Sequence, residues 1–288
     1  MDQGAQEAPP PLVANLVTFI TGNCVPPAME RVRLGLSTPT FVDTIDEFLE
    51  RTAREGWDFA EFNHLDLPPF SPELLDTLER ERVKGLAADL GLELTLHAGD
   101  CDLLTLDPGF LRYSKERIRI ETELARDLDA VYLNTHLGFP ERMVRPGGSL
   151  WADEHFDFQA RIEDAVKHVA DVADSTGVRI LYENTYRLID PLMEAINDCS
   201  SPLVGFLLDV GHANFAGGIR ELHATMSRRG KLFAMHLHDN DGRWDNHAPL
   251  GSGTVDLEGV ELPGYVVVEV RNWDQALGTR EEFRKRYL

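Results

Sequence analysis

The chain has 288 residues, with 28 lysines and arginines against 49 aspartates and glutamates, giving a formal net charge of -21. This excess of acid argues against a nucleic-acid-binding protein, because such proteins neutralise phosphates with Lys and Arg, and against anionic membrane surfaces. No apolar run approaches the roughly 20 residues that span a bilayer. The three cysteines are scattered, and Asp2 and Glu7 stand where a secretory leader would carry positive charge, so a cytoplasmic protein is expected.

Two parts of the chain differ in pattern. Residues 1–28 are rich in proline, carry little charge and show no period, whereas a regular pattern begins at Arg31. We therefore expect residues 1–28 to be a loosely ordered leader and residues 29–288 to form one domain. That domain is long enough for a sizeable core.

From Arg31 onward, short β-type runs alternate with amphipathic helical runs. The expected strands are Val32–Gly35, Asp58–Phe62, Glu93–His97, Ala130–His136, Arg179–Glu183, Leu203–Asp209, Leu232–His238 and Tyr265–Glu269. Helical spacing links Ile45, Phe48, Leu49 and Ala53, then Ile120, Leu124 and Leu128, then Ile162, Val166, Val169 and Ala173. Helix starts are expected at Ser71–Glu73 and Asp157, and helix ends at Gly177 and Gly230.

The eight strand–helix units predict a (β/α)8 TIM barrel, a fold that typically has about 250 residues. The strands are rich in Val, Leu and Ile rather than strictly alternating, as expected for parallel strands buried on both faces. A doubly wound open sheet is the competing topology. Residues 37–40, after the first strand, contain no glycine-rich turn, so the barrel is favoured.

The later strands end at side chains that can bind metal. Strands three to eight finish at or near His97, His136, Glu183, Asp209, His236 and Glu269, and the loops that follow add His212, Asp245 and His247. Closing a parallel barrel would bring these nine residues to the mouth where barrel active sites lie. Imidazoles and carboxylates without thiolates suit Zn, Mn or Co.

Each of these residues also has a purely structural interpretation. Asp209 could cap the following helix, and Glu183 or Glu269 could pair with Arg187 or Arg271. Six ionisable strand ends in succession nevertheless favour a metal site, because unpaired buried charge is costly. His238 shares a strand face with His236, which leaves it either a substrate-binding or a supporting role. His155, His168 and His223 are expected to be solvent-exposed, and His64 is a weaker candidate for the mouth.

Several motifs carry a resemblance to a known family. They are Asp209-Val-Gly-His212, Tyr182-Glu183-Asn184-Thr185, Val268-Glu269-Val270-Arg271, and His236-Leu-His-Asp-Asn-Asp-Gly with its continuation Asp245-Asn-His247-Ala-Pro-Leu-Gly-Ser-Gly. From Met29 to the C-terminus the chain resembles the xylose isomerase-like barrel superfamily, which includes sugar isomerases and epimerases and the endonuclease IV type of AP endonuclease (family 2). The resemblance implies one divalent ion on Glu183, Asp209, His236 and Glu269 in the epimerase branch. In the endonuclease branch it implies three zinc ions on all nine residues.

Other positions favour the epimerase branch. The endonuclease branch has an aromatic residue at the position of Asp100 and usually asparagine at that of His238. Asp102 adds to an expected acidic rim, whose only cations are Arg142, Arg145, Arg187, Arg243 and Arg271. DNA binding needs several phosphate contacts on a basic stripe.

The expected function is therefore a metal-dependent isomerase or epimerase of a small sugar-like polyhydroxy carbonyl compound. The metal would stabilise an enediolate, Glu183 and Glu269 would act as acid and base, and His212, His238, Arg243 and Arg271 would bind the substrate. The alternative is a zinc-dependent phosphodiesterase of the endonuclease IV type, and a third interpretation is a barrel that binds without turnover. One to three divalent ions are compatible with the ligand set, and a homo-oligomer is left open.

Overall fold

The computed structural model describes residues 31–38, 42–63, 70–99, 101–136, 138, 158–185, 190–216 and 218–288. The expected leader lies outside these residues, as do His64, Asp100, Arg142, Arg145, His155, Asp157 and Arg187. Within the described ranges, no helix is long and apolar enough to cross a membrane. One compact unit spans Val32–Leu288.

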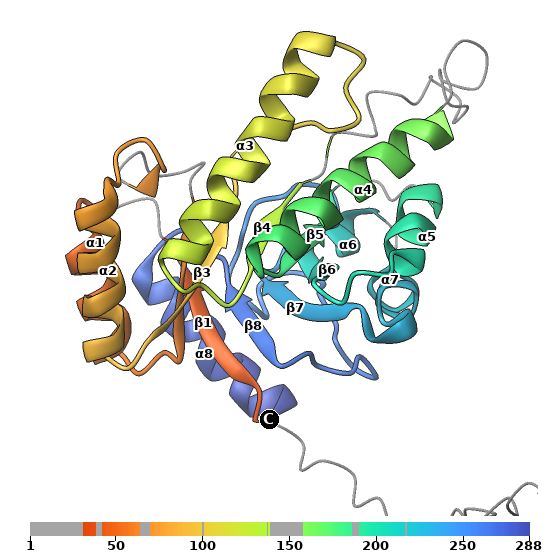
Figure 1. Cartoon of the computed structure of the whole chain (residues 1–288). Coiled ribbons are helices and arrows are strands. Elements are labelled where there is room, and N and C mark those ends of the chain that lie inside the picture. The colour runs from red at the N-terminus through yellow and green to blue at the C-terminus, as the bar shows by residue number, and fades with distance from the viewer. Residues whose placement is uncertain are drawn as a thin grey trace, which may run out of the picture. The chain divides into compact units, whose positions relative to one another are not determined.

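Eight parallel strands close into a barrel in chain order, so that β1 pairs with both β2 and β8 (Figure 1). They are β1 (Arg33–Ser37), β2 (Phe59–Asn63), β3 (Glu93–His97), β4 (Leu133–Thr135), β5 (Ile180–Glu183), β6 (Val204–Asp209), β7 (Leu232–Leu237) and β8 (Tyr265–Val268). The predicted (β/α)8 barrel is confirmed. β4 is shorter than expected. The N–H of Ala130 bonds to the carbonyl of Ala125 in the turn after the preceding helix, so this residue does not belong to the strand.

Helices surround the strands. They are α1 (Ile45–Arg54), α2 (Thr77–Asp89), α3 (Pro108–Asp127), α4 (Phe158–Thr176), α5 (Asp190–Asp198), α6 (Val210–Ala216), α7 (Ile219–Met226) and α8 (Trp273–Tyr287). The expected helix start at Ser71–Glu73 is wrong. α2 begins at Thr77 because the side chain of Asp76 caps it, accepting the N–H of Glu79 at 2.9 Å. Gly177, with φ 76°, follows α4 as expected.

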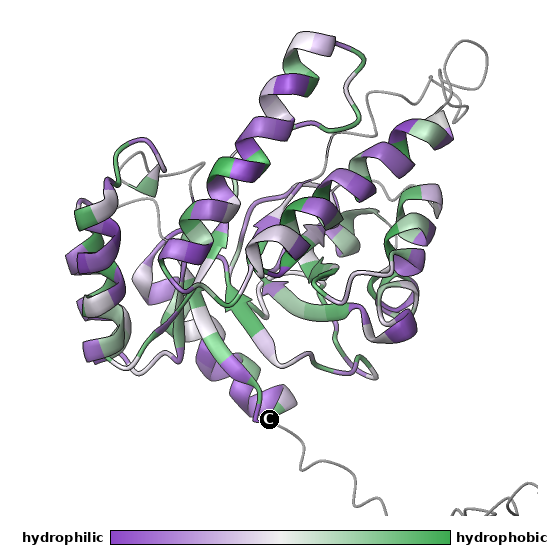
Figure 2. Ribbon diagram, viewed as in Figure 1, coloured by the Kyte–Doolittle hydropathy of each residue, from purple (hydrophilic) through white to green (hydrophobic). Residues whose placement is uncertain are grey.

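The helices bury the faces that their spacing predicts. Ile45, Phe48 and Leu49 of α1 are buried, as are all four apolar residues predicted for α4. On α3 the buried positions include Ile118 and Leu124, whereas Ile120 is only half-buried. In Figure 2 the central strands are mainly hydrophobic, while the helices alternate between hydrophobic and hydrophilic residues. Burial of these helix faces on the strands fixes the barrel and therefore the positions of the strand ends.

The barrel interior is apolar in one part and polar in another. Tyr132, Leu181, Leu207 and Ala234 form a buried cluster of their own, separate from the layer between strands and helices. Gly35 leaves room for the ring of Phe59, since a Cβ at residue 35 would lie 2.2 Å from it. Towards the carboxyl ends of the strands the buried residues become histidines and carboxylates. The fold therefore places polar side chains at the carboxyl ends of the strands, next to an apolar part of the barrel interior.

Candidate metal and active site

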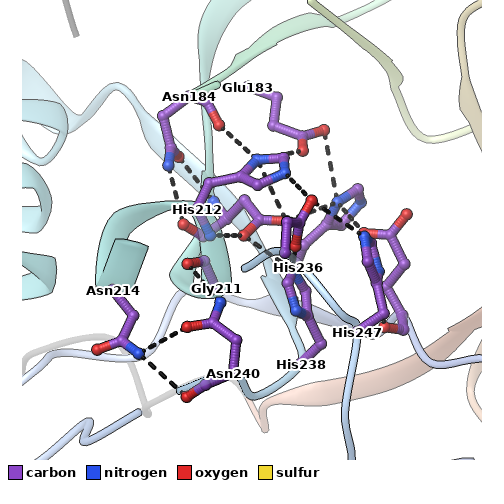
Figure 3. A network of polar contacts seen from close by, with 12 residues as sticks. Glu183, Asn184, Gly211, His212, Asn214, His236, His238, Asn240 and His247 are labelled. Atoms are coloured by element: carbon purple, nitrogen blue, oxygen red, sulfur yellow. Dashed lines mark hydrogen bonds and ion pairs between the residues drawn. The ribbon is translucent and has the colours of Figure 1, made fainter. Parts of the chain in front are cut away.

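The candidate site lies at the carboxyl ends of the strands and is shown in part in Figure 3. All nine residues expected to bind metal are described. Eight of these nine residues, together with His238, form three groups. Within each group, every residue offers one nitrogen or carboxylate oxygen that lies within 4.8 Å of those of the other members. The groups are Glu183, Asp209, His236 and Glu269; His97, Glu183 and His236; and His212, His238, Asp245 and His247. Barrel closure thus brings together residues that are far apart in the sequence.

Glu183 is at the centre of the first two groups. It ends β5, is 1% exposed, and one of its carboxylate oxygens lies 3.1 Å from His97 Nε2 and 3.4 Å from His236 Nδ1. The other oxygen lies 3.4 Å from Nε2 of His136, the ninth expected ligand. The Asn134 side-chain amide donates to the same carboxylate. These neighbours come from β3, from β7 and from β4 and its end, so the position of Glu183 depends on barrel closure.

Asp209 is placed both to cap a helix and to bind a metal ion, the two roles expected from the sequence. Its carboxylate accepts the backbone N–H of His212 at 2.6 Å, which caps α6, and it also belongs to the candidate metal group. Its backbone is fixed by Asn184, whose side chain accepts from the Asp209 N–H at 2.7 Å and donates to its carbonyl at 2.8 Å. The helix cap therefore orients the carboxylate towards the other ligands.

His238 is fully buried behind Asp209. Its Nε2 lies 3.2 Å from both carboxylate oxygens of Asp209, and its ring stacks on that of His247 with centroids 4.1 Å apart. Gly211 is required for this position, since a Cβ there would lie 1.9 Å from the His238 ring. His238 was expected either to bind substrate or to support the site. These contacts favour the second role, in which His238 holds the candidate ligand Asp209 in place.

The group formed by His212, His238, Asp245 and His247 is organised around Asp245. One carboxylate oxygen of Asp245 lies 3.0 Å from His212 Nε2 and 3.4 Å from His247 Nε2. The second nitrogen of each ring faces a backbone carbonyl, that of Asn184 for His212 at 2.8 Å and that of Glu269 for His247 at 3.2 Å. Both rings are therefore oriented with Nε2 towards Asp245.

Charge pairing shifts the pKa values throughout the site. Burial disfavours the charged form of His97, but the carboxylate of Glu183 outweighs burial and raises the pKa of His97 to about 9. The pKa of His247 is likewise raised to about 9, since Glu269 and Asp245 outweigh burial. Burial would raise the pKa of Glu183, but His236 and His136 hold it well below its usual range. Without metal, the site is an array of ion-paired imidazoles and carboxylates.

The donor set fits a divalent metal ion. Neither ring nitrogen of His236 has an aligned hydrogen-bond partner among the described residues, although carboxylate oxygens of Glu61 and Glu269 lie 3.0 Å from them. Buried polar atoms in native proteins are normally hydrogen-bonded. On the Nδ1 side, where oxygens of three carboxylates converge, a cation among them would satisfy these lone pairs. Oxygen and imidazole ligands without thiolate suit Zn, Mn or Co.

The loop after β7 contains residues that hold the site and that were quoted from the sequence only as part of a motif, with no role assigned. The Asp239 carboxylate accepts four backbone N–H groups at 2.8–3.0 Å, from Asn240, Gly251, Gly253 and Val255. A pair of backbone hydrogen bonds joins Asp239 to Ala248, next to His247. The Asn240 side chain donates to the Gly211 carbonyl at 2.8 Å. The sequence signal was a run of Asp, Asn and Gly after a strand, which is typical of a structured turn.

Glu61, on β2, is a second residue that the sequence reasoning missed. It is fully buried, and its Oε1 lies 3.0 Å from His236 Nε2. Arg243 and Arg271, predicted to bind substrate, are both exposed, on the loop after β7 and just after β8 respectively. Their role stays a prediction.

Three expectations about surface residues are wrong. Asp102 is 4% exposed rather than part of an acidic rim, because Ser114 binds its backbone N–H and its own carboxylate accepts the N–H of Leu104. His168 and His223 are half-buried rather than exposed. Their ring nitrogens lie 3.1 and 2.9 Å from the carbonyl oxygens of Lys115 and Glu261.

Comparisons with known proteins agree with the barrel fold. A family model described as xylose isomerase-like TIM barrel matches residues 49–284. An uncharacterized protein of Methanocaldococcus jannaschii is 24% identical over 280 residues, or 89% of each chain.

Solved structures with a similar fold include a D-tagatose 3-epimerase-like protein, with a TM-score of 0.72 at 21% identity over 88% of this chain and 96% of that one. The 3-keto-D-glucoside 4-epimerase of E. coli has a TM-score of 0.67 at 21% identity over 88% and 98%. A Thermus thermophilus protein soaked with ZnCl2 has a TM-score of 0.66 at 23% identity over 88% and 97%. At these identities the likeness shows the fold.

Proposed function

The chain belongs to the xylose isomerase-like TIM barrel family, and on that premise we propose that it is a divalent-metal-dependent isomerase or epimerase of a small sugar-like polyhydroxy carbonyl compound. One observation carries the proposal. The carboxylates of Glu183 and Glu269, which come from strand ends three strands apart, converge on His236 Nδ1 at 3.4 and 3.0 Å. Two carboxylates facing one point are what proton removal and return require.

The names of the fold neighbours support the same reaction class. They include an L-ribulose 3-epimerase, a D-psicose 3-epimerase with D-tagatose and the 3-keto-D-glucoside 4-epimerase. Each of these names describes a sugar carrying a carbonyl and neighbouring hydroxyls. We assign the same substrate class to this chain.

Glu183, Asp209, His236 and Glu269 would hold the ion, which when bound supplies Lewis-acid polarisation of a carbonyl. One of the two glutamates removes the proton from the carbon next to the carbonyl, and the other returns a proton to the opposite face. His212, Arg243 and Arg271 bind substrate hydroxyls, while His238 keeps Asp209 in place. The low exposure of both glutamate side chains, 1% and 14%, limits the access of bulk water to the proton that is transferred.

Exchange of a substrate hydrogen with solvent tests this proposal. Protein loaded with Mn²⁺, Co²⁺ or Zn²⁺ is incubated with a panel of ketoses in D2O, and deuterium incorporation next to the carbonyl is measured by NMR. We expect incorporation and epimerisation that chelation abolishes. Glu183→Gln and Glu269→Gln should each lose at least about 100-fold in rate, in line with general acid–base catalysis. No exchange with any ketose and metal, or full turnover in both variants, contradicts the proposal.

A second candidate, a zinc phosphodiesterase of the endonuclease IV type, is favoured by one specific observation. The described residues form two further candidate ligand groups beside the central one. They are His97 with Glu183 and His236, and His212 with His238, Asp245 and His247. Three metals could activate hydroxide and stabilise a leaving oxygen. Incubation with a duplex containing an abasic site separates the two candidates. Zinc-dependent incision at catalytic rates would replace the first proposal with the second.

A further inference from the structure

Glu61 is a buried carboxylate that the proposed reaction does not use. It lies in the middle of β2 and is 0% exposed. Its Oε1 is 3.0 Å from His236 Nε2, whereas its Oε2 is 3.4 Å from the Thr95 hydroxyl and 3.5 Å from that of Tyr132. The contact with the imidazole is thus the shortest of the three that the Glu61 carboxylate makes, although the two atoms are not aligned for a hydrogen bond in the metal-free structure. An ionised carboxylate inside a barrel is costly unless it is paired and hydrogen-bonded.

The two nitrogens of His236 face different surroundings. Nε2 faces Glu61, while Nδ1 lies 3.0 Å from Glu269, 3.4 Å from Glu183 and 3.8 Å from Asp209. These three candidate ligands are therefore on the Nδ1 side, whereas Glu61 is on the Nε2 side. In an imidazole that binds metal, the hydrogen bond made by one nitrogen decides which nitrogen is left for the ion.

His236 differs from the neighbouring histidines in this respect. In His97, His212 and His247 it is Nδ1 that faces a backbone carbonyl, at 3.0, 2.8 and 3.2 Å, which leaves Nε2 for the site. In His236 the orientation is reversed, and the supporting acceptor is a carboxylate. A carboxylate behind a ligating imidazole fixes its tautomer and raises its basicity.

We propose that Glu61 is a positioning residue, which accepts the Nε2–H of His236 when the ion is bound and so presents the Nδ1 lone pair to the group of Glu183, Asp209 and Glu269. The inference rests on the proposed function only in that this group holds a metal ion. It assigns to β2, which provides none of the nine expected ligands, a role in building the site.

The first test needs no variant. Zn²⁺ is added to the wild-type protein labelled with 15N-histidine, and long-range proton–nitrogen correlation identifies which His236 nitrogen carries the proton. We expect a protonated Nε2 and a metal-bound Nδ1. A protonated Nδ1, zinc bound through Nε2, or no zinc at His236 would each overturn the proposal.

The second test replaces the Glu61 carboxyl group by an amide of the same shape. Zinc affinity is measured by calorimetric titration for Glu61→Gln and for Glu121→Gln, a matched change at another fully buried glutamate, which lies on α3 and accepts the Gly99 N–H. Loss of this kind of support typically weakens metal binding about 10- to 100-fold, and we expect that loss for Glu61→Gln alone. Unchanged affinity, or equal losses in both variants, contradicts the proposal. If Glu61→Gln does not fold, the wild-type tautomer decides.

The outcomes keep this inference apart from the proposed function. Zinc on His236 Nδ1 without turnover of any ketose leaves the role of Glu61 intact and removes the epimerase proposal. Ketose turnover with zinc bound through Nε2 supports the epimerase proposal and removes the role of Glu61.

Discussion

Gly211 is a residue whose lack of a side chain makes room for the ring of another. A Cβ at this position would lie 1.9 Å from His238 Cε1, and the same ring lies 3.2 Å from both oxygens of Asp209. Gly211→Ala should therefore push His238 away from Asp209. We expect a loss of about 1–3 kcal/mol in the free energy of unfolding, as for other overpacked cores, together with weaker metal binding. Denaturant unfolding and metal titration measure the two effects.

Two variants act as controls for this prediction. Gly278 also lies within a helix, α8, but a Cβ there would meet nothing within 4 Å, so Gly278→Ala should leave stability unchanged or raise it by up to about 1 kcal/mol. The double variant Gly211→Ala, His238→Ala should recover part of the lost stability, because the clashing ring is gone. Equal stability of Gly211→Ala and Gly278→Ala would show that the close approach of Gly211 to the His238 ring does not exclude a side chain.

The raised pKa of His97 gives the metal-free protein a pH-dependent stability. Glu183 outweighs burial and moves the pKa of His97 from 6.5 to about 9 on folding. A pKa that is higher in the folded state contributes stability below pH 6.5, and that contribution is lost as the pH rises through about 9. The Tm of chelator-treated protein should therefore fall between these values, and His97→Gln should reduce the fall. A Tm that is constant or rises over this range contradicts the assignment.

At the scale of elements, the loop from β7 to β8 is organised by one carboxylate. Asp239 accepts four backbone N–H groups, three of which belong to Gly251, Gly253 and Val255 beyond His247. Gly253 fits only because it has no Cβ, since that atom would lie 2.1 Å from the Asn240 carbonyl oxygen. The loop carrying Asp245 and His247 is thus tied back to the end of β7. This anchoring explains how a long connection can present candidate ligands in fixed positions.

Removing this carboxylate should loosen the loop. Hydrogen bonds to a charged acceptor contribute about 1.5–3 kcal/mol each, and water would replace part of them. We expect Asp239→Ala to lower the free energy of unfolding by about 2 kcal/mol or more. It should also speed amide hydrogen exchange at Gly251, Gly253 and Val255. The control is Asp241→Ala in the same loop, where an exposed carboxylate accepts from Arg243 and Trp244 N–H and exchange at the three amides should not change. Equal exchange in both variants would contradict the anchoring role.

Apolar runs in the sequence located the strands because this signal is local, although β4 is shorter than its run. The apolar runs of β3, β6 and β8 match their expected positions within one residue. The start of α2 was missed because Ser71-Pro72-Glu73 and Asp76 both have the chemistry of a cap, and only the tertiary packing selects Asp76. Glu61 was missed for a different reason. Both faces of a barrel strand are buried, so spacing alone does not show which alternate residues face the interior.

At the scale of the whole molecule, barrel closure gathers charges that no single element could hold together. Five carboxylates, those of Glu61, Glu183, Asp209, Asp245 and Glu269, lie beside the imidazoles of His97, His136, His212, His236, His238 and His247. In the metal-free protein, the raised pKa values of His97, His212, His236 and His247 show that protons supply the compensating positive charge. A divalent ion would take over that role and displace protons on binding.

Metal binding should therefore be visible in the stability of the entire barrel, since the ligands come from β5, β6, β7 and the end of β8. An ion that binds only the folded state stabilises it by about 2.7 kcal/mol when its free concentration is about 100 times its Kd. We expect Mn²⁺ or Zn²⁺ to raise the Tm of chelator-treated protein, and calorimetry in buffers of different ionisation enthalpy to show proton release. Elemental analysis then gives the stoichiometry: near one ion per chain is expected if the Glu183, Asp209, His236 and Glu269 group alone is filled, and near three if all three groups are. A Tm that no divalent ion changes would mean that the protons, and not a metal, are what this cluster is built to hold.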